Sequence, residues 1–130
     1  FRQRGEASVV LRHINTPVPT VADLGVPAVL ADLVMQRNGL ILIVGATGSG
    51  KSTTLAAMID HRNASTGGHI LTLEDPIEFV HQHKKAIVAQ REVGTDTQSF
   101  STGMKAALRE SPDVILMGEI RDLETMEFAL

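Results

Sequence analysis

Gly45-Ala46-Thr47-Gly48-Ser49-Gly50-Lys51-Ser52 has the form G-x-x-x-x-G-K-S, and the residues on both sides of it fit that form. The apolar run LILIV at 40–44 predicts a buried strand. The run TTLAAMI at 53–59 predicts a helix with Leu55, Met58 and Ile59 on one face. A strand, a glycine-rich turn and a helix are together the context in which this pattern forms a phosphate-binding loop, the P-loop.

The residue types of this loop explain its chemistry. Glycines let backbone N–H groups point inward as an anion-binding nest, and the start of the helix adds partial positive charge. Lys51 supplies an ammonium group for the β- and γ-phosphates, and the Ser52 hydroxyl can ligate Mg²⁺. The sequence therefore predicts binding of a nucleoside triphosphate; the alternative is a glycine-rich turn with a solvated lysine. The expected cofactor-binding residues are Gly45, Ala46, Thr47, Gly48, Ser49, Gly50, Lys51, Ser52 and Thr53.

Composition limits the other possibilities. The chain has 130 residues, the size of one modest domain, and a formal net charge of −3. With that charge and only four Phe as aromatic residues, we expect no nucleic-acid partner that binds through charge or base stacking. Cysteine is absent, which removes disulfides and thiolate sites and fits a reducing cytosol. No apolar stretch approaches the roughly 20 residues that a membrane span needs, so we expect no direct membrane insertion.

The order of the elements predicts the fold class. Apolar runs predict strands at 9–11, 70–73, 87–89 and 114–117, in addition to 40–44. Helical spacing predicts helices at 26–34, after a capping box at 20–23, at 100–108, and from 123 onward. Strands that alternate with helices favour an α/β fold with a parallel sheet and helices on both faces.

Two acidic groups follow predicted strands. Glu74, Asp75 and Glu78 come after the strand that ends at Leu73, and Glu119 comes after 114–117. Ligands of open parallel sheets gather at the carboxyl ends of the strands. A triphosphate hydrolase needs one carboxylate to organise Mg²⁺ and another to polarise the attacking water. The alternative for each carboxylate is a helix cap or a solvated loop charge.

Four segments in order resemble one family. LTLEDPIEFVH (71–81), QREVG (90–94) and PDVILMGEIRDLET (112–125), joined to GATGSGKST (45–53), resemble the type II/IV secretion ATPases. Within that family they are most similar to the type IV pilus retraction, or twitching motility, branch, which contains the PilT and PilU proteins. GEASVVLRHI (5–14), the Arg62-Asn63 pair, VHQHK (80–84) and REVGTDT (91–97) look more like PilU than PilT.

The resemblance implies roles for particular residues. It implies a P-loop NTPase with a RecA-like core at 21–130, a linker at 17–20 and the end of a small, PAS-like N-terminal domain at 1–16. Glu78 matches the glutamate that activates water, and Glu119 matches the Walker B glutamate, which here follows a glycine. Mg²⁺ would then be held directly by Ser52 and through water by Glu119. Arg12 matches an arginine finger that reaches a neighbour's γ-phosphate, and Arg4 is a weaker candidate.

By resemblance, the expected function is Mg²⁺-dependent ATP hydrolysis that drives pilus retraction. The implied assembly is a homo-hexamer, or a ring with a paralogous retraction ATPase, on the cytoplasmic face of the inner membrane beside the pilus platform proteins. The family's His box is expected after Leu130, and a further arginine before Phe1. Alternatives are a pilus-assembly or type II secretion ATPase, a nucleotide-binding module without turnover, and a nucleic-acid translocase.

A few residues allow a second interpretation. His81 and His83 lie on one face of an extended segment, but loop histidines explain them better than a metal site does. Arg91 and Arg121 recur in the family motifs, and the alternative for both is a salt bridge.

Overall fold

A computed structural model describes residues 2–11, 14 and 17–129. The elements are β1 (Arg2–Gln3), β2 (Glu6–Ala7), α1 (Val29–Val34), α2 (Lys51–Ser65), β3 (Gly68–Glu74), β4 (Ala86–Glu92), α3 (Phe100–Ala107), β5 (Val114–Met117) and α4 (Leu123–Ala129).

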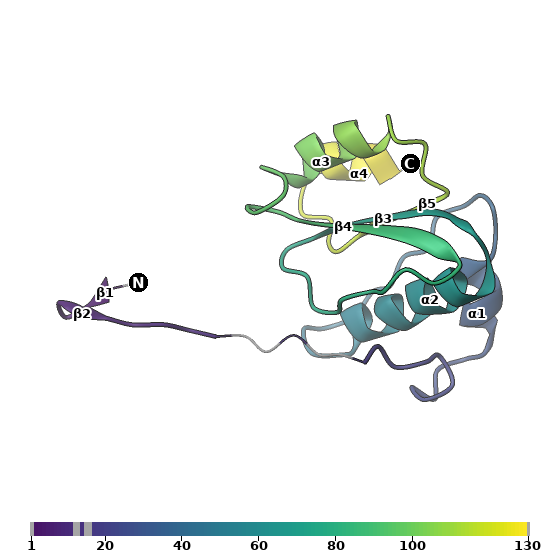
Figure 1. The fold of residues 1–130 in the computed structure, drawn as a ribbon, viewed down its shortest axis with the longest axis horizontal. Helices are drawn as coiled ribbons and strands as arrows, with labels where there is room; N and C mark the ends of the chain where they lie inside the picture. Colours follow the sequence, from purple (N-terminus) through teal and green to yellow (C-terminus); the bar gives the residue numbers. More distant parts are fainter. Residues whose placement is uncertain (1, 12–13, 15–16, 130) are drawn as a thin grey trace.

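The centre of the molecule is a three-stranded sheet of order β4-β3-β5, in which both pairings are parallel. Helices α1 and α2 lie on one side of this sheet, and α3 and α4 lie on the other (Figure 1). The α/β fold class with a parallel sheet covered on both faces is therefore confirmed.

Each face of the sheet has its own core. Ile70, Ala86 and Val88 pack with Ile59 of α2 on one face. Successive strand side chains point to opposite faces, so the other face receives Leu71 and Leu73. These pack with Met104 and Ala107 of α3, and both leucines are fully buried. A central strand buried on both faces explains why β3 reads as a continuous apolar run.

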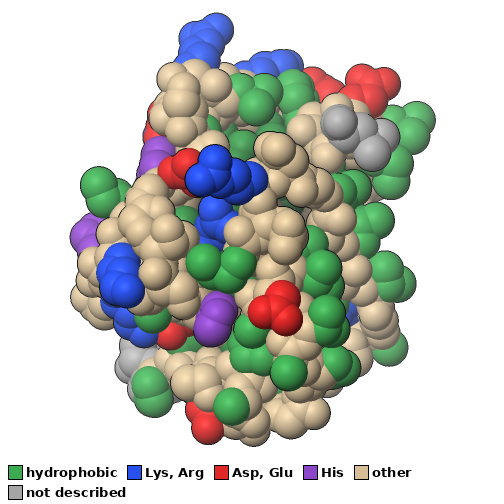
Figure 2. Space-filling model, turned by 90° about the vertical axis from the view of Figure 1, so that its right-hand side faces the viewer, with side chains coloured by type: hydrophobic (Ala, Val, Ile, Leu, Met, Phe, Trp, Pro, Cys, Tyr) green, Lys and Arg blue, Asp and Glu red, His purple; other side chains and the backbone are tan. Residues whose placement is uncertain are grey.

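Two predicted strands are wrong. Residues 40–44 and 9–11 have no regular structure, and their side chains are exposed: 60% for Leu42 and 89% for Val44. A strand needs a partner for its backbone, and among the described residues the sheet strands pair only with each other. Residues 8–11 instead follow the small β1–β2 hairpin, which projects from the α/β body (Figure 1). Apolar side chains accordingly remain at the surface, and Figure 2 shows many of them on the face that lies to the right in Figure 1.

The helix predicted at 26–34 is shorter than expected. The capping box forms, because Thr20 N donates to Asp23 Oδ2 at 3.0 Å and Asp23 N donates to Thr20 Oγ1 at 3.1 Å. It closes a turn rather than starting the helix, since Gly25 has a left-handed φ of 63° and Pro27 has no N–H to donate. Helix α1 therefore begins only at Val29.

Candidate functional site

The P-loop has the backbone geometry of an anion-binding turn. Gly48 and Gly50 have φ values of 79° and 89°, the left-handed region that glycine adopts without strain, and Gly50 is the N-cap of α2. A Cβ on Gly45 would lie 2.6 Å from Ser49 Oγ, so a side chain at this position would require the Ser49 side chain to move. Glycine is therefore favoured at position 50 of the motif and at Gly48, one of its variable positions.

The phosphate-binding groups of the loop are exposed to solvent or only partly covered. Thr54 N makes the first helical hydrogen bond, to Gly50 O at 2.9 Å, so the N–H groups just ahead of it have no carbonyl within the helix. Those N–H groups belong to Lys51, Ser52 and Thr53, at the positive end of a 15-residue helix. Lys51 Nζ donates to Ala46 O at 2.8 Å, which folds the ammonium back over its own loop. This is a cradle suited to the negative charge of a triphosphate.

The carboxyl ends of β3 and β5 lie together, as the sequence predicted. Gly118 N donates to Leu73 O at 2.8 Å, which brings Glu74 beside the segment that carries Glu119. A Cβ on Gly118 would lie 3.3 Å from both Glu74 Cα and Leu73 O. The glycine before Glu119 therefore permits the close approach of these two strand ends.

The Glu119 carboxylate lies against an arginine. Its Oε1 is buried and accepts no hydrogen bond, although Arg121 Nη2 lies 2.7 Å away as an ion pair. Arg121 Nη1 also lies 4.0 Å from Asp75 Oδ2. Glu119 Oε1 is therefore paired with the Arg121 guanidinium, while the exposed hydroxyl of Ser52 at the start of α2 is an oxygen ligand of the type that Mg²⁺ takes.

The three acidic residues after β3 differ in their surroundings. Glu74 Oε1 accepts hydrogen bonds from Thr72 Oγ1 at 2.6 Å and from Gln90 Nε2 at 3.1 Å, so the protein itself holds this carboxylate. Asp75 faces Arg121. Glu78 is exposed, and no hydrogen bond or ion pair within the described residues involves it. Of the three, Glu78 is the carboxylate free to meet a water molecule.

The proposed arginine finger cannot be placed, because Arg12 lies outside the described residues. Arg4 lies in the turn of the β1–β2 hairpin with a φ of 53°, and that hairpin projects away from the α/β body (Figure 1).

The salt-bridge interpretation of Arg91 and Arg121 is confirmed. Arg91 Nη2 lies 2.6 Å from Glu110 Oε1, away from the acidic residues of the site. Arg121 pairs instead with Glu119 and Asp75 of the site itself. It is 68% exposed, so the pair contributes little to stability, yet it sets the local charge around Glu119.

The two loop histidines do different things. His81 is buried, its Nδ1 accepts no hydrogen bond, and that atom lies 3.9 Å from Asp60 Oδ1. Burial lowers the pKa of His81; Asp60 opposes this and Lys84 adds to it. His83 Nδ1 accepts a hydrogen bond from Val88 N at 3.1 Å. In the described part of the chain no three His, Cys, Asp or Glu side chains group as a metal site.

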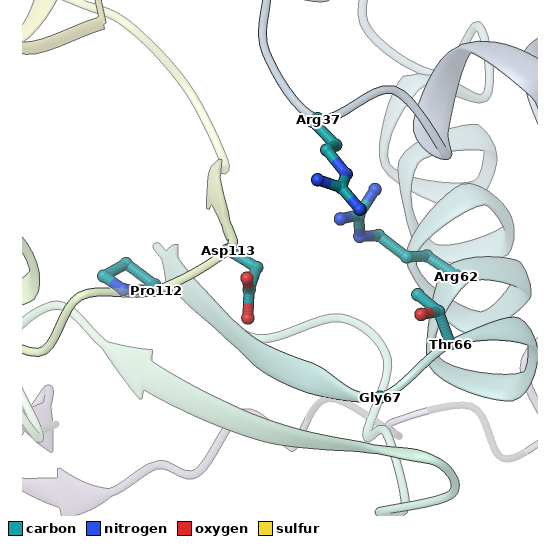
Figure 3. Close-up of a pocket in the computed structure, with 6 residues that line it drawn as sticks. All are labelled: Arg37, Arg62, Thr66, Gly67, Pro112 and Asp113. Carbon is teal, nitrogen blue, oxygen red and sulfur yellow. The ribbon is translucent and has the colours of Figure 1, made fainter.

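An open pocket of about 420 Å³ lies at the opposite edge of the sheet, where β3 and β5 begin (Figure 3). Its polar groups already serve the fold. Arg62 Nη1 donates to Val34 O at 2.6 Å and to Gln36 O at 3.1 Å, and Asp113 Oδ2 accepts from His69 N at 2.7 Å. The lining residues are Arg37, Arg62, Thr66, Gly67, Pro112 and Asp113.

Sequence reasoning gave no role to two buried or half-buried amides near Glu78. Asn63 and Gln90 both lay within segments quoted for their similarity to the family, but an amide side chain carries no motif for a specific chemistry. Their hydrogen bonds join segments that are far apart in the sequence, so only the structure reveals them.

Comparison with known proteins gives consistent matches. The family model "Type II/IV secretion system protein" matches residues 4–130. The chain is 52% identical over 130 residues to the type IV pilus ATPase PilU of Pseudomonas aeruginosa, covering 100% of this chain and 34% of that protein. It is 53% identical over 130 residues to the type IV pilus retraction ATPase PilT of the same organism, covering 100% of this chain and 38% of that protein.

A solved structure shows the same arrangement. The crystal structure of the pilus retraction motor PilT with bound ADP superimposes with a TM-score of 0.93 at 54% identity, covering 96% of this chain and 36% of that one. The chain thus spans about a third of the length of the relatives that it matches, and it is about equally similar to PilT and PilU.

Proposed function

The chain belongs to the type II/IV secretion system protein family, and from that premise we propose that it is the nucleotide-binding part of a Mg²⁺-dependent ATPase that powers type IV pilus retraction. The observation that carries the proposal is the P-loop geometry at the start of α2. Gly50 caps the helix with a left-handed φ, and Lys51 follows it directly. The similar PilT structure contains ADP, which supports a nucleotide as the ligand.

The residues divide the work as follows. Lys51 and the N–H groups of the loop bind the β- and γ-phosphates. Ser52, directly, and Glu119, through water, would hold Mg²⁺, which would supply neutralisation of the charge on the phosphate oxygens. Glu78 orients the attacking water and accepts its proton. The water oxygen bonds to the γ-phosphorus, the bond to the β,γ-bridging oxygen breaks, and ADP and inorganic phosphate leave.

The assembly is part of the same proposal. Arg12 would act as an arginine finger in the site of a neighbouring subunit, within a homo-hexamer or a ring shared with a paralogous retraction ATPase. The ring would work on the cytoplasmic side of the inner membrane with the pilus platform proteins. Within the described residues, none of the helices has the length and hydropathy of a membrane span.

A secretion ATPase of the same family is less well supported. The type II secretion system protein E of Aeromonas hydrophila is 45% identical over 103 residues, covering 78% of this chain. The retraction proteins match at higher identity over the whole chain.

The test is steady-state ATP hydrolysis by the full-length protein, compared with Lys51→Ala and Glu78→Gln. We expect each variant to lose turnover by roughly 100-fold or more, because each removes a group that acts on the transferred phosphoryl group or on the water. Unchanged turnover in both variants would sink the proposed function. Addition of DNA should leave the wild-type rate unchanged, and a strong stimulation would instead support a nucleic-acid translocase.

A further inference from the structure

Residues 75–85 connect β3 to β4 and carry Glu78. Parallel neighbours require a connection that returns along the sheet, and such connections are usually helices. This one contains no helix or strand, only a β-bridge residue at Phe79. Hydrogen bonds from the side chains of its neighbours therefore make a large contribution to fixing its path.

On the sheet side, the connection is held by Gln90 of β4. Gln90 Oε1 accepts from His81 N at 2.7 Å, while Gln90 Nε2 donates to Phe79 O at 2.9 Å and to Glu74 Oε1 at 3.1 Å. One amide thus binds the backbone immediately after Glu78 and the carboxylate at the end of β3. If the amide oxygen and nitrogen of Gln90 exchanged places, the nitrogen would face the donor His81 N and the oxygen would face two acceptors. The orientation of the amide is therefore fixed.

On the helix side, the connection is held by Asn63 of α2, whose side chain is 0% exposed. Asn63 Nδ2 donates to Gln82 O at 2.7 Å, and Asn63 Oδ1 accepts from Lys84 N at 3.1 Å. Lys85 N donates to Asn63 O at 2.9 Å, and Lys84 Nζ lies 2.7 Å from Asp60 Oδ2. The same helix begins at Lys51, so one rigid element holds both the phosphate-binding lysine and the connection.

Within the described residues, the Glu78 side chain makes no hydrogen bond or ion pair that would fix its position. The position of its carboxylate therefore follows from the backbone on either side, and Phe79, which is buried, follows it directly. The backbone before Glu78 is held by Glu92 of β4, whose Oε2 accepts from Ile77 N at 3.0 Å, and the backbone after it is held by Gln90 and Asn63.

We propose that Gln90 and Asn63 are positioning residues that hold the Glu78 segment at a fixed place relative to the P-loop. This inference rests on the proposed function. Loss of these bonds should lower turnover and leave nucleotide affinity intact, since affinity comes from the loop and the start of α2. A misplacement of about 1 Å can reduce a rate by roughly 100-fold.

The first test is Gln90→Met in the full-length protein, a change that keeps the length of the side chain and removes its three hydrogen bonds. We expect kcat to fall by roughly 10- to 100-fold, with the Kd of a fluorescent ATP analogue within about 2-fold of wild type. The matched control is Arg91→Met, one residue further along β4, which removes only the Glu110 ion pair and should leave kcat unchanged. An unchanged kcat in Gln90→Met, or a loss of affinity as large as the loss of turnover, would overturn the proposal.

The second test combines Gln90→Met with Glu78→Gln. If Gln90 acts through Glu78, then Gln90→Met should have no further effect on the residual rate of Glu78→Gln. A general structural role predicts that the two losses multiply, and that result would overturn the proposal.

Hydrogen exchange separates this proposal from the proposed function. In Gln90→Met the amides of residues 77–85 should exchange faster than in wild type, while those of α3 should not change. If the wild-type protein hydrolyses no ATP, the proposed function fails, and faster exchange at 77–85 would still establish that Gln90 fixes this segment. Unchanged exchange there would overturn the inference whatever the turnover.

Discussion

The P-loop and the 75–85 connection are opposites in how they are specified. The P-loop follows a sequence motif, but residues 45–50 are exposed, and among the described residues the Lys51 ammonium donates only to a carbonyl of its own loop. The connection has no regular structure, but buried or half-buried amides from β4 and α2 fix its backbone. The difference suggests that the phosphate cradle adapts to its ligand, whereas the carboxylate that acts on water is held in place beforehand.

The largest effect is expected from a substitution of Asn63, the buried amide that holds the connection. Asn63→Leu should lower the free energy of unfolding by about 2 kcal/mol, because it removes the two hydrogen bonds that the buried Asn63 side chain makes to Gln82 O and Lys84 N. Urea denaturation of the full-length protein measures this change. Asn38→Leu is the control, since Asn38 is exposed, and it should change stability by less than about 0.5 kcal/mol. Equal effects of the two substitutions would show that the bonds of Asn63 carry no special weight.

A smaller effect is expected in the P-loop. Gly50→Ala places a Cβ on a residue with a φ of 89°, which costs about 1–2 kcal/mol and should weaken nucleotide binding because the loop must change shape. Gly67→Ala is the control, since its Cβ would meet only Lys85 O at an ordinary 3.5 Å. Titration of both variants with nucleotide measures their affinities. Wild-type affinity in Gly50→Ala would show that the left-handed N-cap is dispensable.

The smallest effect concerns pH. Burial lowers the pKa of His81 in the folded protein, with Asp60 of α2 and Lys84 of the connection as the charged groups that face it. Above the unfolded value of about 6.5 the ring is neutral in both states, so it contributes nothing to the pH dependence. As the pH falls below that value, the unfolded chain binds the proton first, and stability is lost.

We therefore expect the wild-type protein to lose more stability than His81→Gln between pH 7.5 and the folded pKa. Denaturation curves of both proteins across this range measure the difference. Identical pH profiles would mean that His81 is not held neutral by its burial.

The parts of the molecule that could be predicted are those in which local sequence carries the physics. The P-loop and the acidic residues after β3 and β5 were predicted because each motif specifies a backbone shape and a strand end. The strand at 40–44 was wrongly predicted, because apolar residues indicate burial whereas a strand also requires a hydrogen-bonded neighbour. The bonds of Gln90 and Asn63 could not be predicted, because they depend on the path by which the connection returns between α2 and β4.

The central claim is that the P-loop binds the nucleotide and that Glu78, held by its segment, acts on it. Equilibrium binding of Mg²⁺–ATP to Lys51→Ala and Glu78→Gln, measured on the full-length protein beside turnover, tests this most directly. We predict that Lys51→Ala loses both affinity and turnover, whereas Glu78→Gln loses turnover and keeps the affinity of the wild type. Loss of affinity in Glu78→Gln equal to that in Lys51→Ala, or full affinity in Lys51→Ala, would contradict the account.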